Sequence, residues 1–65
     1  MNKTHLTLTF RESFTIDPVT FAQDESLTVT YLGGGDLLRC QLEDGRVVEI
    51  PSRVVRQEIT SDAGL

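Results

Sequence analysis

The chain has 65 residues, 38% of them hydrophobic, and ten Asp and Glu residues against six Lys and Arg give a formal net charge of −4. Its length allows one domain, close to the lower size at which a single core suffices, and its apolar fraction exceeds that of disordered chains. The negative charge disfavours nonspecific binding to nucleic acid or anionic membranes. The single cysteine excludes an internal disulfide, so nothing points to an oxidising compartment.

The sequence contains no segment that resembles a signal peptide or a membrane span. The N-terminal residues lack the apolar region of a signal peptide, and no run approaches the ~20 apolar residues of a transmembrane helix. We therefore expect a soluble, cytoplasmic protein that does not contact a membrane. Residues 1–60 are expected to form a single small β-domain, followed by a disordered tail over residues 61–65.

The first predicted element is a strand over residues 5–10, where leucine and phenylalanine alternate with threonine. Phe14 and Ile16 continue this alternation and suggest a return strand, with residues 11–13 as the turn. The segment after them has two interpretations. In the first interpretation, residues 19–24 form a short helical turn, because Asp17 and Pro18 suit the start of a helix. In the second, residues 11–26 form a long irregular excursion, and three apolar side chains attach it to the core. These are Phe14, Ile16 and Phe21.

Residues 27–50 contain three runs in which apolar and polar residues alternate, the pattern of an antiparallel β-meander. The side chains expected on the core face are those of Leu27, Val29, Tyr31, Leu38, Cys40, Leu42, Val48 and Ile50. The first break is interpreted as a four-residue loop over residues 33–36. It pairs Tyr31 with Leu38 and Val29 with Cys40, so that apolar residues meet.

The second break allows two registers that differ by one residue. A two-residue loop at Asp44-Gly45 would place Cys40 opposite Glu49 and mix the two faces. A three-residue loop over residues 43–45 pairs Cys40 with Val48 and keeps the faces separate, so we predict this register. Gly45 can adopt the left-handed conformation that the end of such a loop requires. On the outer face this register places Arg39 opposite Glu49.

Pro51 ends the third run, because proline has no N–H for the β-ladder, and a turn at Pro51-Ser52 then leads to a last short strand. This ending, Ile50-Pro51-Ser52 with Val55 three residues further on, resembles the Src-homology-3-like small barrel, in which one 3₁₀ turn joins the fourth and fifth strands. The acidic run Asp24-Glu25 is similar to the one that this family places before its second strand.

The resemblance covers residues 24–60 and implies an all-β fold, a small five- or six-stranded barrel or a twisted antiparallel sheet. Signalling members of the family bind proline-rich ligands through aromatic residues that include a tryptophan. This chain has no Trp, and its single tyrosine, Tyr31, is expected on the core face. Proline-rich ligand binding is therefore not expected of it.

Several residues invite a chemical role, and each has a simpler structural interpretation. His5 and Cys40 are the only His and Cys, too few for a structural zinc site, and the phase of Cys40 places it in the core. The glycines at 33–35 lack the Lys-Ser/Thr and the following helix of a phosphate-binding loop. The carboxylates of Asp36, Glu43 and Asp44 are interpreted as solvated turn residues. We expect no cofactor, no metal and no enzymatic activity.

The surface suggests binding to a macromolecule. Val47 and one of Val54 and Val55 are expected to point outward beside an unpaired edge strand. The predicted function is that of a small non-enzymatic regulatory or adaptor module acting by protein–protein contact, with self-association included. Its candidate residues are Val47, Arg53, Val54, Val55 and Arg56. The alternative is a nucleic-acid-binding regulator that uses an arginine-bearing face. That face would consist of Arg39, Arg46, Arg53 and Arg56.

Overall fold

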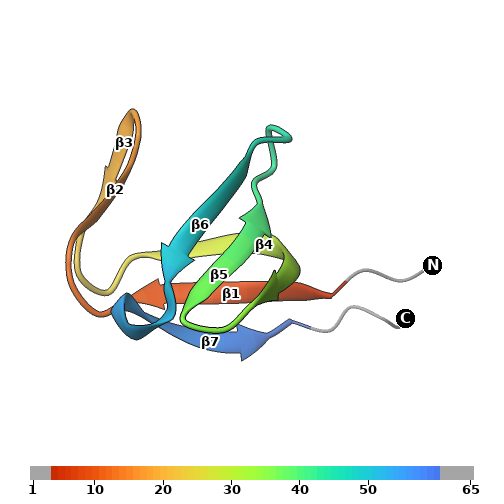
Figure 1. The fold of residues 1–65 in the computed structure, drawn as a ribbon. Helices are drawn as coiled ribbons and strands as arrows, with labels where there is room; N and C mark the ends of the chain where they lie inside the picture. The colour runs from red at the N-terminus through yellow and green to blue at the C-terminus, as the bar shows by residue number, and fades with distance from the viewer. Residues whose placement is uncertain (1–3, 61–65) are drawn as a thin grey trace.

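The computed structural model describes residues 4–60, and short β-strands make up most of them (Figure 1). In chain order the elements are β1 (His5–Phe10), β2 (Phe14–Ile16), β3 (Val19–Phe21), β4 (Ser26–Gly34), β5 (Leu37–Gln41), β6 (Val47–Pro51), the 3₁₀ turn η1 (Ser52–Val54) and β7 (Val55–Ile59). The expected all-β fold is confirmed, with seven strands instead of five or six. The tail predicted over residues 61–65 lies outside the described residues.

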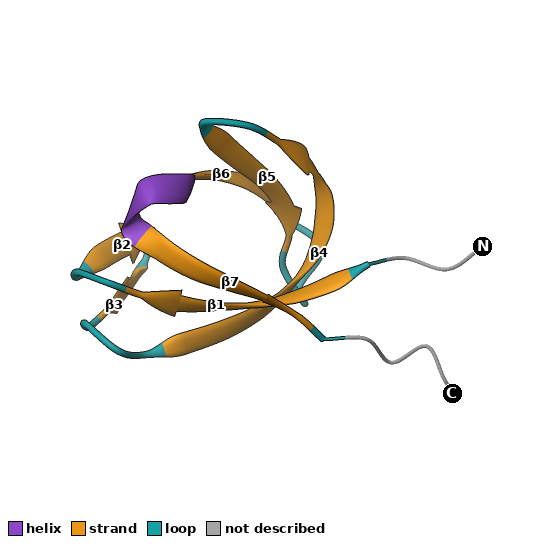
Figure 2. Cartoon of the chain, turned by 90° about the horizontal axis from the view of Figure 1, so that it is seen from below, coloured by secondary structure: helices purple, strands orange, loops and turns teal. Residues whose placement is uncertain are grey.

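Five strands form one antiparallel sheet in the order β6-β5-β4-β1-β7, and β2 and β3 form a separate hairpin. Figure 2 shows the sheet curling, with β5 and β6 on one side of the interior and β1 and β7 on the other. The two edge strands, β6 and β7, do not pair with each other, so the sheet is open. A 3₁₀ turn precedes the last strand of this sheet, as the resemblance implied.

The core fills the space inside the curl. Alternate residues of β1 are buried because the strand presents one face to the interior, and Leu8 and Phe10 are fully enclosed. The buried apolar residues are Leu6, Leu8, Phe10, Ile16, Val29, Leu38, Cys40, Ile50, Val54 and Val55. They come from both sheets and from η1, so one core serves all the described elements.

The turn between β5 and β6 has the predicted register. Cys40 pairs with Val48 and Arg39 with Glu49. The loop closes through Leu42 N–H, which donates to the Arg46 carbonyl at 2.8 Å, and Gly45 adopts a positive φ of 95°. Only glycine adopts this conformation readily, so Gly45 enables the three-residue loop that keeps the apolar face intact.

The predicted register between β4 and β5 is wrong. Tyr31 pairs with Cys40 instead of Leu38, and the register shifts between Tyr31 and Gly33, so that Leu32 is an extra residue in a bulge. β4 continues through Gly34, and the connection shortens accordingly. Before the bulge, the observed pairing differs from the predicted one by two residues, so Leu27 and Val29 keep the expected face toward the core. Tyr31, at the bulge, is nevertheless exposed.

The segment over residues 11–26 contains a hairpin over residues 14–21, and neither a strand returning along β1 nor a helical turn forms. Phe14 pairs with Phe21 and Ile16 with Val19, so β2 finds its partner in β3. The interpretation as an excursion attached by apolar side chains is closer to the structure. The rings of Phe14 and Phe21 stack on Phe10 with centroid distances of 6.0 and 4.9 Å, and Ile16 is buried.

The expectation that Val54 or Val55 points outward is wrong, because their side chains are only 4% and 2% exposed. Val54 ends η1 and Val55 begins β7 in an extended conformation. The strict alternation of a strand does not apply across this change of backbone conformation, and both side chains enter the core. Neither residue is available as a partner contact, and Asp at either position would disrupt the fold.

The buried and exposed valines provide a direct test of this assignment. We expect Val55→Ala to lower the free energy of unfolding by about 1–3 kcal/mol, since it removes buried methyl groups and leaves a cavity. Val47→Ala, at a position that is 55% exposed, should change it by less than about 0.5 kcal/mol. Urea denaturation followed by circular dichroism measures both variants, and equal losses would contradict the assignment.

The glycines at the end of β4 provide a second matched pair. A Cβ on Gly34 would lie 2.8 Å from the Leu37 carbonyl oxygen, whereas a Cβ on Gly35 would meet nothing within 4 Å. Gly34→Ala should therefore destabilise the protein by about 1–3 kcal/mol through overpacking. Gly35→Ala should change the stability by less than about 1 kcal/mol. Thermal or urea unfolding distinguishes them, and a neutral Gly34→Ala would contradict the close approach of β4 and β5.

Candidate functional site

The outer face of β5 and β6 carries two of the features expected from the sequence. Val47 is exposed, and Arg39 donates to the Glu49 carboxylate at 3.3 Å. Both charged side chains are half-exposed or more, so solvent screens this ion pair and its contribution to stability is small. Leu37 and Leu32 are also exposed on or beside this face.

β6 presents an open hydrogen-bonding edge next to Val47. Leu42 and Arg46 are a hydrogen-bonded pair, and such pairs alternate along an antiparallel ladder. Val48 and Ile50 therefore bond to β5, while the backbone groups of Val47 and Glu49 point away from it. Among the described residues β6 pairs only with β5. An unpaired strand edge of this kind is a template for pairing with another chain.

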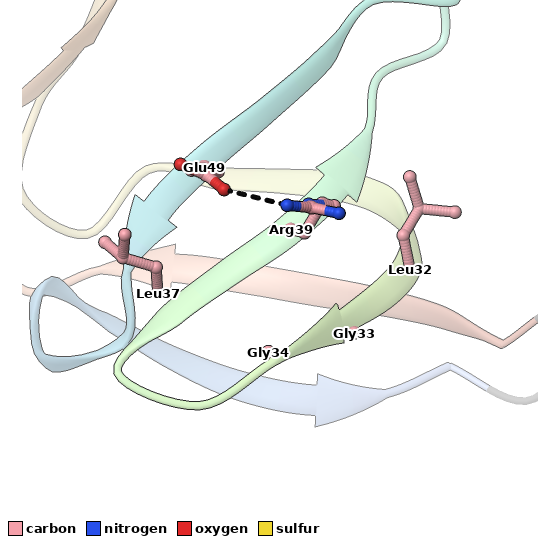
Figure 3. Close-up of a pocket in the computed structure, with 6 residues that line it drawn as sticks. All are labelled: Leu32, Gly33, Gly34, Leu37, Arg39 and Glu49. Atoms are coloured by element: carbon pink, nitrogen blue, oxygen red, sulfur yellow. Dashed lines mark hydrogen bonds and ion pairs between the residues drawn. The ribbon is translucent and has the colours of Figure 1, made fainter.

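A shallow hollow lies on the same outer face, beside the Arg39–Glu49 pair (Figure 3). Gly33 and Gly34, which carry no side chains, leave space between Leu32 on one side and Leu37 on the other. The hollow has a volume of about 190 Å³. Only two of its six lining residues have apolar side chains, so it has little capacity to desolvate a ligand.

A second hollow, the hairpin groove, lies between the β2–β3 hairpin and the β5–β6 turn and has a volume of about 240 Å³. Its apolar lining consists of Ile16, Val19, Phe21, Leu27 and Leu42, and its polar lining of Glu43, Asp44 and Arg46. Val19 is exposed at the groove and Ile16 is buried beneath it. Figure 1 shows the hairpin and the β5–β6 turn projecting from the same side of the sheet.

Arg46 spans the groove between its two walls. Its guanidinium donates to the Asp44 carboxylate at 3.0 Å and to the Asp17 carbonyl, at the tip of the hairpin, at 2.8 Å. Asp44 also accepts from the backbone N–H of Arg46 at 3.0 Å. This backbone hydrogen bond, together with the Arg46 side chain, lowers the pKa of Asp44 below its ordinary value. Asp44 and Arg46 thus neutralise each other at the rim of the groove.

The four arginines proposed for nucleic-acid binding lie on four different elements. Arg39 is on β5, Arg46 in the following turn, Arg53 on η1 and Arg56 on β7. The first two are paired with carboxylates, at 3.3 and 3.0 Å.

Arg53 and Arg56 are both exposed, and Arg11 joins this region because its backbone N–H donates to the Val54 carbonyl at 2.8 Å. Of the four arginines, Arg53 and Arg56 have no carboxylate partner among the described residues, and they lie on η1 and on the strand that follows it. Arg11 was not predicted, because it is distant in sequence from the other two residues.

Cys40 lies in the core as predicted, with no exposed surface, and burial raises the pKa of its thiol. His5 begins β1 and is half-buried. Within residues 4–60 no three His, Cys, Asp or Glu side chains are grouped so that they could hold a metal ion. Because the Cys40 thiol is buried and its pKa is raised, the structure offers no activated nucleophile at this residue.

The groove residues were not predicted as a site, and only part of the exposed apolar surface could have been. Leu37 is out of phase with Leu38, so the alternation already placed it on the outer face with Arg39. No local signal links Val19 to Leu42, because the packing of the hairpin against the sheet brings them together. The sequence did identify Val47.

Comparison with protein-family models, with curated proteins and with solved structures finds no match to this chain. No helix in the described part of the chain has the length and apolar character to span a membrane.

The buried thiol gives a pH-dependent prediction. Because the pKa of Cys40 is higher in the folded protein, the unfolded chain loses this proton first as the pH rises. The contribution of the protonated Cys40 thiol to the free energy of unfolding is fully present below the thiol's ordinary pKa of about 8.5. As the pH rises above this value, the free energy of unfolding falls. Cys40→Ala should remove this part of the decline, as measured by urea denaturation across the alkaline range.

The same burial predicts slow chemistry at Cys40. Thiol reagents should modify the native protein slowly and the urea-denatured protein rapidly, because the side chain has no exposed surface in the fold. Fast modification of the native protein would show that Cys40 is accessible and would restore a redox or nucleophilic role.

Proposed function

We propose that this chain is a small binding module that acts through protein–protein contact, either with another protein or with a second copy of itself. The observation that carries this proposal is that both edge strands of the sheet bear exposed apolar side chains. Val47 on β6 is 55% exposed and Ile59 on β7 is 72% exposed. Open backbone groups beside apolar side chains favour pairing with another polypeptide.

The amount of exposed apolar surface supports the same proposal. Six large apolar side chains are between 39% and 72% exposed in the described part of this small domain. They are Val19, Tyr31, Leu32, Leu37, Val47 and Ile59. Single exposed apolar residues are normal, but those on the edge strands β6 and β7 accompany unpaired backbone groups. A protein partner would cover both.

The alternative, binding of nucleic acid, has weaker support. Arg39 and Arg46 are paired with carboxylates, and only the region around η1 retains arginines without such partners among the described residues. The negative net charge opposes the approach of phosphate at long range. Tyr31, the exposed aromatic residue, lies on β4 rather than on η1 or β7.

Capture of partners by the immobilised protein tests this proposal. We expect a protein to be recovered equally from source-cell lysate with and without nuclease treatment. Val47→Lys should reduce its recovery to less than about one fifth, because it places a charge at the centre of an apolar contact. Thr28→Lys is the control, since it adds the same charge to an exposed position on the central strand β4.

Self-association is tested separately by the mass of the purified protein in analytical ultracentrifugation. A dimer that Val47→Lys or Ile59→Lys dissociates would identify the second copy as the partner. A monomer that captures no protein would contradict the proposed function. Capture that disappears after nuclease treatment would favour the nucleic-acid alternative instead.

A further inference from the structure

The hairpin groove, defined above, differs from the rest of the exposed surface because it combines an apolar floor with an acidic rim. Five of its eight lining residues are apolar, and they come from β2, β3, β4 and the residue that follows β5. The groove on the protein surface is therefore assembled from elements that meet only in the folded state.

The size of the groove limits what it can bind. Pockets for small organic ligands have volumes of about 300–1,000 Å³. The hairpin groove, at about 240 Å³, is below this range and suits one or two amino-acid side chains. Its apolar lining favours an aliphatic or aromatic side chain, because burial there removes apolar surface from water.

The charged residues around the groove determine which residues are favoured next to the bound side chain. Glu43 forms no hydrogen bond or ion pair with any described residue, whereas Asp44 and Arg46 neutralise each other. The charged residues that line the groove are therefore two carboxylates and one guanidinium, a formal charge of −1 that Glu43 contributes. Cationic groups are therefore attracted to this rim, and the phosphates of nucleic acids or anionic lipids are repelled.

We propose that the hairpin groove binds a segment of a partner protein in which an aliphatic or aromatic side chain is flanked by Lys or Arg. The apolar side chain enters the groove beside Val19, and a flanking cationic side chain pairs with Glu43. This inference rests on the proposed function and specifies the chemistry of the partner.

The first test is a titration of the ¹⁵N-labelled protein with short peptides, followed by NMR. The probe is acetyl-Gly-Arg-Phe-Arg-Gly-amide. The amide chemical-shift changes that it causes in the protein should be confined to the groove residues. Two controls remove one property each: Glu replaces both Arg residues in the first, and Ser replaces Phe in the second. Each control peptide should bind about fivefold more weakly or worse than the probe peptide, and added salt should weaken binding of the probe peptide.

Two matched pairs of variants test the groove itself. Val19→Lys should weaken binding of the probe peptide by about tenfold or more, while Leu37→Lys adds the same charge at an apolar residue of similar exposure outside the groove and should not. Glu43→Lys should weaken it severalfold, and Glu58→Lys, on the far edge strand β7, serves as its control. Urea denaturation confirms that the variants remain folded.

Several results would overturn the proposal. They are equal binding of the acidic and basic peptides, chemical-shift changes spread over the whole surface, and equal losses in Val19→Lys and Leu37→Lys. These results are separable from failure of the proposed function. If a captured protein depends on Val47 but not on Val19 or Glu43, the protein contact stands and the groove proposal fails. If the peptide binds the groove and the chain captures no protein, the proposed function fails.

Discussion

The packing of Phe10 joins the parts of this protein that lie far apart in the sequence. Its ring is fully buried and stacks on Phe14 and Phe21, which attaches the β2–β3 hairpin. Its backbone N–H donates to the Glu25 carbonyl and its carbonyl accepts from Asp24, which closes the base of the hairpin excursion. In the ladder it pairs with Val55, so the last strand is aligned by the same residue. The hairpin, the main sheet and the C-terminal strand thus share one anchor.

The small size of the domain explains why apolar groups remain at its surface. A chain of this length buries only about 60% of the surface that it exposes when unfolded. Here the sheet curls without closing, which leaves β6 and β7 as edges and Val47 and Ile59 in solvent. The hairpin is attached at its base by the stacking of Phe14 and Phe21 on Phe10, and at its tip by the hydrogen bond from Arg46 to the Asp17 carbonyl. The groove beneath it is the space that these two attachments leave unfilled.

The candidate site was only partly predictable from sequence. The exposure of Val47 and the Arg39–Glu49 pair followed from the alternation within a single hairpin, which is a local property. The exposure predicted for Val54 or Val55 failed because the alternation rule was extended across a 3₁₀ turn. The groove was missed, since Val19 and Leu42 become neighbours only when the hairpin packs on the sheet.

The amino-acid sequence by itself determined the all-β class, the burial of Cys40 and the register of β5 with β6. The period of two distinguishes registers that differ by one residue, because such a slip exchanges the faces. It does not distinguish registers that differ by two, so only the tertiary structure decided how β4 pairs with β5 and placed the bulge at Leu32. The tertiary structure likewise decided the partner of β2 and formed the hairpin groove. The groove depends on residues far apart in the sequence, such as Val19 and Leu42, and the β2–β3 hairpin is attached to the core by the stacking of Phe14 and Phe21 on Phe10. The alternation of apolar residues encodes neither arrangement.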